Sequence, residues 1–215
     1  MGLKVYGSVY STNTQRVVLV LNLKKIPFEY IEVDLSKGEH KAEEFMKQQP
    51  FGAVPYIDDD GFVLFESRAI CNYIETKYPN QGPTLIPTDL KANARYNQGL
   101  SIEVTSFEAY AAPLLYEKLF KTYEGLPADE HLVETYERKL TRTLDVYEKI
   151  LSKQKYLGGD QLTLADLYHL PILSLFPAIS FNAVNERLAV AQWAQTLLDT
   201  PEWKAILSDG PKSTA

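Results

Sequence analysis

A short proline-rich segment divides this sequence into two halves with different patterns. Residues 79–87 contain three of the chain's 12 prolines, together with Asn80, Gln81 and Gly82. Proline cannot continue a helix and cannot donate to a sheet, so this composition is typical of a linker. We therefore predict one domain at residues 1–80, a linker at 81–88 and a second domain at 89–215.

Short strands and helices alternate in the first half. Strand-like apolar runs occur at 4–6, 28–33, 54–57 and 62–65, whereas helical spacing occurs at 17–25, 42–46 and 67–78. The Asp60-Gly61 pair between the last two runs indicates a hairpin turn, because glycine adopts positive φ without steric cost. The predicted order is β-α-β-α-β-β-α.

The second half has only amphipathic helical runs. They lie at residues 90–119, 130–151, 164–175 and 188–198, and no strand pattern interrupts them. The sequence therefore predicts an α/β domain followed by an all-helical domain.

Charge and cysteine content exclude several classes of function. The net charge is −6, and no Lys/Arg cluster offsets it, so we expect neither nucleic acid nor a membrane surface as a partner. No membrane-spanning run or leader is visible, and the single Cys71 agrees with a reducing compartment, so we expect a cytoplasmic protein. His40, His131 and His169 lack metal-ligand spacing, so we expect no metal site.

The hydroxyl-rich segment from Tyr10 to Thr14 stands between a predicted strand and a predicted helix. Backbone N–H groups at a helix start, together with the positive end of the helix dipole, favour an anion there. Ser and Thr also occur at such positions simply as N-caps. Both interpretations stay open.

The segment 50–55 enters a strand through Pro55. A cis bond before Pro55 would turn the backbone of Val54 outward, where its N–H and C=O could pair with an extended peptide ligand. The alternative is an ordinary trans proline at a strand start.

A third polar cluster, at 66–68, lies at a strand-to-helix junction. The N–H and Oγ of Ser67 could hold a carboxylate, and Glu66 could hold an ammonium group. The simpler alternative is a serine cap followed by a solvated Arg68.

These clusters, in this order, resemble the glutathione site of glutathione transferases, and the resemblance extends over essentially the whole chain. It is most detailed for the serine-type phi class. The matching motifs are Ser-Thr-x-x-x-Arg-Val at 11–17, Gly-Glu-His-Lys at 38–41, Gln-Pro-Phe-Gly-x-Val-Pro at 49–55, Phe-Glu-Ser-Arg-Ala-Ile at 65–70, Leu-Asp-Val-Tyr-Glu at 144–148, Lys-Tyr-Leu-Gly-Gly-Asp at 155–160 and Leu-Thr-Leu-Ala-Asp-Leu at 162–167. In the last of these, Thr163 and Asp166 can form a capping box.

The resemblance implies a thioredoxin-like βαβαββα domain that binds glutathione, followed by an all-helical domain that forms the electrophile pocket. Ser11 would donate a hydrogen bond to the glutathione sulfur. The other implied glutathione contacts are Thr12 at the helix start, His40 and Lys41 at the glycyl carboxylate, Val54 through its backbone, a cis Pro55, and Glu66 with Ser67 at the γ-glutamyl end.

Two features bear on these assignments. Ala53 stands in the site where phi sequences often carry Gln, so one side-chain hydrogen bond to glutathione is missing. Tyr6 and Tyr10 are rivals of Ser11, because other transferase classes use a tyrosine near the end of the first strand. The Ser-Thr-x-x-x-Arg-Val context favours Ser11.

Aromatic residues supply the remaining candidates. Tyr116 and Phe120, four residues apart on one predicted helix, are candidates together with Tyr10 for the apolar wall against the electrophile. The alternative is that Tyr116 and Phe120 fill the core. Phe51, on a Gly/Pro-rich loop, is expected to insert into an apolar pocket of a second copy, which predicts a homodimer.

The expected activity is conjugation of the glutathione thiolate to hydrophobic electrophiles, with glutathione as co-substrate and no cofactor. Peroxidase activity toward organic hydroperoxides is compatible with the same thiolate. Deglutathionylation and dehydroascorbate reduction usually require a cysteine in place of Ser11. The alternative to an enzyme is a protein that has the transferase fold but does not catalyse a reaction, and that acts as a ligand carrier or a scaffold.

Overall fold

The computed structural model describes residues 2–214, so the two end positions of the expected domains lie outside it. Contacts within the chain define two compact units. The first contains the residues up to Thr84 together with those from Thr200 onward, and the second is Leu85–Asp199. The expected division at 81–88 assigns the residues after 200 to the helical domain, whereas the contacts group them with the first unit.

The first unit contains the predicted order of elements, which the structure confirms. The sheet has the order β2-β1-β3-β4, in which β2 is parallel to β1 and the other neighbouring pairs are antiparallel. The elements are β1 (Leu3–Gly7), α1 (Thr12–Lys24), β2 (Glu29–Glu32), a 3₁₀ turn η1 (Glu39–Lys41), α2 (Glu43–Gln48), β3 (Tyr56–Asp59), β4 (Phe62–Phe65), α3 (Ser67–Lys77) and α11 (Pro201–Asp209).

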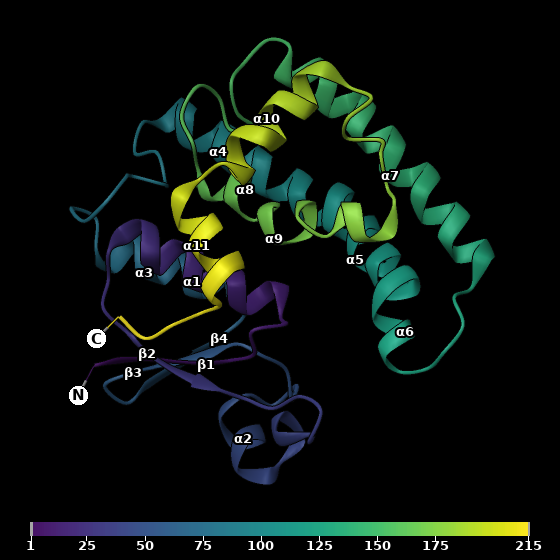
Figure 1. Ribbon diagram of the computed structural model, residues 1–215. Helices are drawn as coiled ribbons and strands as arrows, with labels where there is room; N and C mark the ends of the chain where they lie inside the picture. The colour runs from purple at the N-terminus through teal and green to yellow at the C-terminus, as the bar shows by residue number, and fades with distance from the viewer. Residues whose placement is uncertain (1, 215) are drawn as a thin grey trace. The chain divides into compact units, whose positions relative to one another are not determined.

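Helix α1 is buried on nearly every side. It lies with α3 on one face of the sheet, and α11 packs against it (Figure 1). The residues from Val17 to Leu21 have no exposed surface. A helix with apolar side chains all round must pack against other elements on several sides. This requirement explains why α11, which is far away in sequence, belongs to the first unit.

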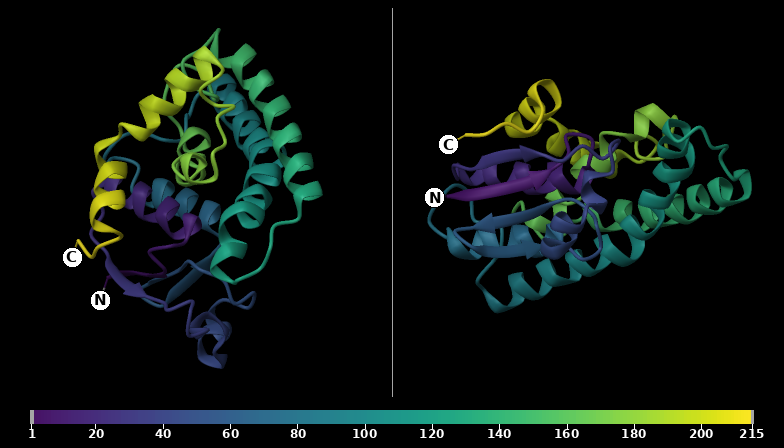
Figure 2. Two further views of the ribbon diagram at one scale, coloured as in Figure 1. Left: turned by 45° about the vertical axis from the view of Figure 1, so that its right-hand side comes forward. Right: turned by 90° about the horizontal axis from the view of Figure 1, so that it is seen from below.

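The second unit is helical, as predicted. Residues 90–123 form one continuous helical run, made of α4 (Leu90–Ile102), a π-helical turn η2 (Glu103–Glu108), α5 (Ala109–Leu115), a second π-helical turn η3 (Tyr116–Phe120) and α6 (Lys121–Tyr123). Helix α7 (Glu130–Leu151) lies beside this run (Figure 2, left). Both α7 and α10 (Leu188–Leu198) have the predicted bounds.

The predicted helix at 164–175 is interrupted in the structure. It consists of α8 (Leu164–Leu167) and α9 (Leu170–Leu173), and a 3₁₀ turn η4 (Phe176–Ile179) follows. Pro171 and Pro177 stand in the first turns of α9 and η4, where proline is tolerated because no intrahelical N–H bond is needed there. Apolar spacing alone did not reveal these breaks.

The expected capping box at the start of α8 is confirmed. The Oγ1 and backbone N–H of Thr163 both donate to Asp166 Oδ2, at 2.9 and 3.1 Å. Asp166 is fully buried, and burial raises the pKa of its carboxyl group. Its Oδ1 also accepts from Leu157 N and from Trp193 Nε1. One side chain therefore joins α8, α10 and the segment before α8.

Among residues 2–214, no helix combines the length and the apolar character needed to cross a membrane. The same residues contain no group of three or more His, Cys, Asp or Glu side chains arranged to hold a metal ion.

Candidate functional site

Ser11 caps the N-terminus of α1. Its backbone is extended, with φ −86° and ψ 118°, and its Oγ accepts a hydrogen bond from Thr14 N at 3.2 Å. The N-cap interpretation is therefore confirmed, and it is compatible with a role toward sulfur. A hydroxyl group can accept and donate at once, so this cap leaves the hydrogen of Ser11 able to point at an anion.

The neighbours of Ser11 differ in their surroundings. Thr12, the first residue of α1, is half-buried, whereas the side chain of Tyr10 is 82% exposed. The ring of Tyr6, in β1, stacks on Tyr56 of β3 at 4.4 Å between centroids. Burial, with the nearby Tyr6 and Asp58, raises the pKa of Tyr56 to about 12, so this ring stays protonated at neutral pH.

The loop before β3 contains Val54 and Pro55. The Val54–Pro55 bond is cis, which confirms that expectation. Gly52 has φ +58°, and its N–H donates to the carbonyl of Gln49 at 2.9 Å, which closes a turn. Ala53 is exposed and Val54 is half-buried. Val54 therefore retains partial access to solvent, although its neighbours Gly52 and Pro55 are buried.

His40 and Lys41 lie together in η1, next to this loop. The ammonium group of Lys41 donates to the carbonyl of Gly52 at 2.7 Å and to that of Phe51 at 3.3 Å. Partial burial, aided by the charge of Lys41, lowers the pKa of His40. Its Nδ1 is buried and has no hydrogen-bond partner within residues 2–214. The imidazole is therefore neutral at pH 7, and the lysine supplies the positive charge.

Glu66 stands at the junction of β4 and α3 in a conformation that favours glycine. Its backbone has φ +71° and ψ 108°, and its side chain is exposed. A non-glycine residue in this region costs free energy, and such strain is often found at binding sites. Ser67, the first residue of α3, is buried. The N–H groups of this first turn have no partner within the helix and form a natural carboxylate site.

Sequence reasoning gave no role to two residues at this site, Asn13 and Arg16. Nη1 of Arg16 donates to Ser67 Oγ at 2.9 Å and also to Asn13 Oδ1, and Ser67 Oγ donates to Asn13 Oδ1 at 3.3 Å. The sequence did contain one signal for this role: an arginine stands directly before the apolar run 17–21, and a charge in apolar surroundings requires a hydrogen-bonding partner. The start of α1 is therefore joined to the start of α3.

The aromatic candidates for the electrophile wall are distributed over both units. Tyr10 belongs to the first unit, whereas Tyr116 and Phe120 lie on η3 in the second unit. The hydroxyl of Tyr116 donates to Glu124 Oε2 at 3.2 Å, and its ring is 41% exposed. Phe120 is half-buried and lies against Tyr123. The alternative that both rings fill the core is therefore wrong.

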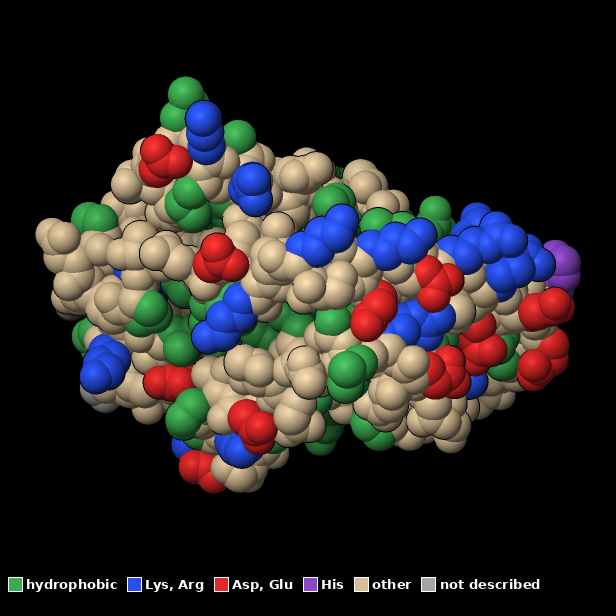
Figure 3. All heavy atoms as spheres, turned by 90° about the horizontal axis from the view of Figure 1, so that it is seen from above, with side chains coloured by type: hydrophobic (Ala, Val, Ile, Leu, Met, Phe, Trp, Pro, Cys, Tyr) green, Lys and Arg blue, Asp and Glu red, His purple; other side chains and the backbone are tan. Residues whose placement is uncertain are grey.

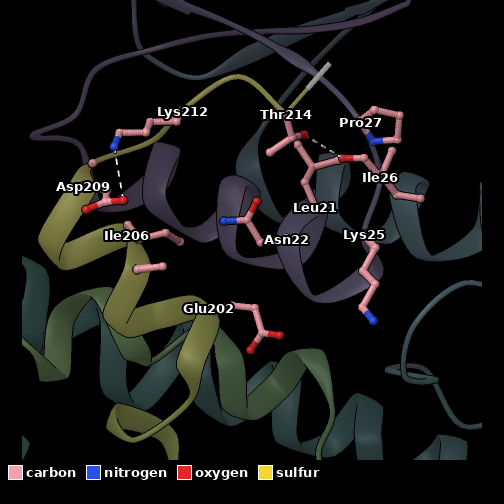
Figure 4. Close-up of a pocket in the computed structure, with 12 residues that line it drawn as sticks. Leu21, Asn22, Lys25, Ile26, Pro27, Glu202, Ile206, Asp209, Lys212 and Thr214 are labelled. Atoms are coloured by element: carbon pink, nitrogen blue, oxygen red, sulfur yellow. Dashed lines mark hydrogen bonds and ion pairs between the residues drawn. The ribbon is translucent and has the colours of Figure 1, made fainter.

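A cavity of the first unit lies away from these residues. It has a volume of about 480 Å³ and lies between the C-terminal end of α1, α11 and the last residues of the chain (Figure 4). Asn22 and Glu202 border it from α1 and α11. None of the predicted site residues lines it.

Comparison with known families matches both halves of the chain. The model described as "Glutathione S-transferase, N-terminal domain" matches residues 1–76, and "Glutathione S-transferase, C-terminal domain" matches residues 107–201.

Individual proteins are similar over nearly the full length. Glutathione S-transferase hmp2 of Hypomyces subiculosus is 43% identical, over 94% of this chain and 96% of its own. Glutathione S-transferase F11 of Arabidopsis thaliana is 41% identical, over 96% of this chain and 98% of its own. The crystal structure of glutathione transferase F7 from Populus trichocarpa superposes with a TM-score of 0.93 at 36% identity, over 97% of this chain and 99% of that one. The chain therefore belongs to the glutathione S-transferase family and, within it, to the phi class.

Proposed function

We propose that this protein conjugates the thiolate of glutathione to hydrophobic electrophiles, and that the hydroxyl of Ser11 stabilises the thiolate. One observation supports the role of Ser11 above others. Its Oγ is held by Thr14 N at the positive end of α1, and its hydrogen remains able to donate.

The energetic requirement for this role is modest. A free thiol has a pKa of about 8.5, so little of it is thiolate at pH 7. Lowering the pKa by about two units requires roughly 2.7 kcal/mol of preferential stabilisation of the anion. A hydrogen bond to a charged acceptor contributes about 1.5–3 kcal/mol, and a helix N-terminus contributes about 0.3–1 kcal/mol. Ser11 and α1 together match the requirement.

The rest of glutathione would extend away from Ser11 along residues of the first unit. The backbone of Val54, next to the cis Pro55, would pair with the cysteinyl unit, and Ala53 and Thr12 would lie beside it. Lys41 and the neutral His40 would receive the glycyl carboxylate. Glu66 would hold the ammonium group of the γ-glutamyl residue and Ser67 its free carboxylate, supported by the free end of α3.

The helical domain would supply the electrophile pocket, with Tyr10, Tyr116 and Phe120 as its apolar wall. This proposal assigns glutathione binding to residues 1–80 and the electrophile to residues 89–215, joined by 81–88. Attack of the same thiolate on an organic hydroperoxide would give peroxidase activity without a further cofactor. The single cysteine supports a cytoplasmic site of action.

We further infer that the protein is a homodimer in which Phe51 inserts into the partner's helical unit. The side chain of Phe51 is 71% exposed, and its ring meets Phe65 edge-on at 6.1 Å between centroids. A large aromatic ring exposed on a loop is unfavourable in a monomer and is typical of an interface anchor.

The helical unit has a groove that we propose as the site that receives this ring. Two cavities of about 480 and 340 Å³ lie along α7 and share Ile102 and Val146 on their walls. Five basic side chains border them, and none has an ion-pair partner within residues 2–214. These are Arg95, Lys139, Arg142, Lys149 and Lys153.

This basic groove contrasts with the chain's net charge of −6. Figure 3 shows the uneven distribution of charge on one face, where basic side chains stand in rows beside a group of acidic ones. A basic, apolar-floored groove on an acidic protein is complementary to the surface of a second copy, which supports the dimer.

The conjugation activity can be tested with an aryl halide, 1-chloro-2,4-dinitrobenzene, and glutathione. The wild type should form the conjugate, Ser11→Ala should lose most of the rate at neutral pH, and Ser11→Thr should keep the larger part of it. The absence of conjugation by the wild type would contradict the proposed function.

A further inference from the structure

Arg16 is a buried cation next to the apolar part of α1. Its side chain has no exposed surface. The residues that follow it, from Val17 to Leu21, are also buried, but they are apolar. A buried charge is stable only when hydrogen-bonding groups surround it. For Arg16, these groups include Asn13 in the first turn of α1 and Ser67 at the first position of α3.

Asn13, Arg16 and Ser67 form a closed triangle of hydrogen bonds. The guanidinium group donates to both of the other side chains, and the hydroxyl of Ser67 donates to the carboxamide oxygen of Asn13. A carbonyl oxygen has two lone pairs, and this arrangement uses both of them. Displacement of any one side chain therefore breaks two hydrogen bonds.

The triangle connects the two helix starts that the proposed function uses. Asn13 precedes Thr14, whose N–H orients the hydroxyl of Ser11. Ser67 begins α3, next to the strained Glu66. The triangle therefore has one corner beside the proposed sulfur site and another corner in the proposed γ-glutamyl site.

We propose that Asn13 and Arg16 are positioning residues for glutathione, which keep Ser11 at a fixed separation from Ser67. This inference rests on the proposed function. A ligand that must contact two points binds best when the protein already holds those points at the required distance, because no ordering cost is added on binding. The hydroxyl hydrogen of Ser67 is used within the triangle, so the carboxylate of the ligand would be received by the backbone N–H of Ser67 at the start of α3.

Asn13→Ala tests this inference better than a change at Arg16, because it leaves the buried guanidinium group and its hydrogen bond to Ser67 in place. The binding of S-methylglutathione, which has no thiol, would be measured by titration calorimetry on the full chain. We expect Asn13→Ala to weaken binding by about fivefold to tenfold. Asn13→Asp, which keeps an acceptor for both partners, should restore affinity to within about twofold of the wild type.

Two comparisons separate positioning from a structural role. In the Ser67→Ala variant the triangle is already broken. Adding Asn13→Ala to that variant should therefore weaken its affinity for S-methylglutathione by less than a further factor of two. Asn22→Ala, the same change at the other end of α1 (Figure 4), should leave affinity unchanged.

Two results would overturn the inference. The first is an Asn13→Ala variant that melts at a lower temperature but binds S-methylglutathione as the wild type does, which would reduce the triangle to a structural contact. The second is full additivity of Asn13→Ala and Ser67→Ala. A wild type that does not bind S-methylglutathione at all would instead remove the proposed function, and this inference with it.

Discussion

Lys24 and Glu75 form an ion pair inside the first unit, with Nζ of Lys24 2.7 Å from Oε2 of Glu75 and almost no exposed surface on either side chain. The pair joins the end of α1 to α3, and Lys24 also donates to the carbonyl of Pro83 at 3.2 Å. The two helices whose N-termini carry the proposed glutathione site are thus also tied together near their C-termini.

Breaking this pair should destabilise the fold strongly. Lys24→Met leaves the carboxylate of Glu75 buried without its cation, which costs about 3–5 kcal/mol of the free energy of unfolding. The double variant Lys24→Met/Glu75→Met should recover much of that loss. Urea unfolding would measure both. Lys47→Met, which breaks the exposed ion pairs of Lys47 with Glu43 and Glu44, is the control and should change little. Equal effects of the buried and exposed changes would contradict this account.

Glu66→Gly should separate stability from binding. Glycine tolerates the φ of +71° at this position, so the substitution relieves backbone strain, but it also adds conformational entropy to the unfolded chain. The net effect should be an increase of about 1 kcal/mol in the free energy of unfolding. The same change removes the proposed partner of the ammonium group of the γ-glutamyl residue, so the KM for glutathione should rise more than kcat falls. Glu66→Gln should raise KM without the gain in stability. A Glu66→Gly variant with unchanged KM would argue against the assignment of Glu66.

His40 should make glutathione binding depend on pH. Burial and Lys41 keep the pKa of the free imidazole below 6.5. A bound carboxylate favours the imidazolium form and raises that pKa, so binding takes up a proton. The affinity for S-methylglutathione should therefore increase as the pH falls from about 7.5 to about 5.5. Calorimetric titrations across this range would measure it, and His40→Gln should flatten the dependence. A wild type whose affinity falls with acidification would contradict this role.

Phe51→Ser should dissociate the proposed dimer. The substitution removes an aromatic anchor, and interface anchors of this kind contribute about 2 kcal/mol or more to association. Light scattering at micromolar concentration should give a dimer for the wild type and a monomer for the variant. Tyr123→Ser, at a similarly exposed ring of the helical unit, should remain a dimer. Arg142→Glu in the groove should also weaken association. A monomeric wild type would refute the dimer.

The order of elements was predictable because the signals that produce it are local. Apolar spacing predicted β1 to α3 in order, and it gave the bounds of α7 and α10. The Thr163–Asp166 capping box also follows from neighbouring residues and was confirmed. The cis bond before Pro55 followed from the family resemblance, since cis is the minority state of such bonds.

What the sequence could not predict depends on contacts between distant residues. Helix α11 lies in the first unit because it buries an apolar side of α1. The spacing of apolar residues within either helix does not indicate this long-range contact. The partners of Arg16 come from residues 3 and 51 positions away. The π-helical turns at 103–108 and 116–120 also have no signal in the apolar pattern, which continues through them.

The pH dependence of kcat/KM for Ser11→Ala tests the central claim most directly. If the hydroxyl of Ser11 stabilises the bound thiolate, the acidic limb of this pH profile should move to higher pH in Ser11→Ala, toward the pKa of the free thiol. At neutral pH, kcat/KM should fall by about tenfold to a hundredfold. Ser11→Gly, which costs the helix cap only a few tenths of a kcal/mol, should show the same shift at nearly unchanged stability. Tyr6→Phe and Tyr10→Phe should leave the limb in place. A shift in either phenylalanine variant, with none in Ser11→Ala, would contradict the assignment of Ser11.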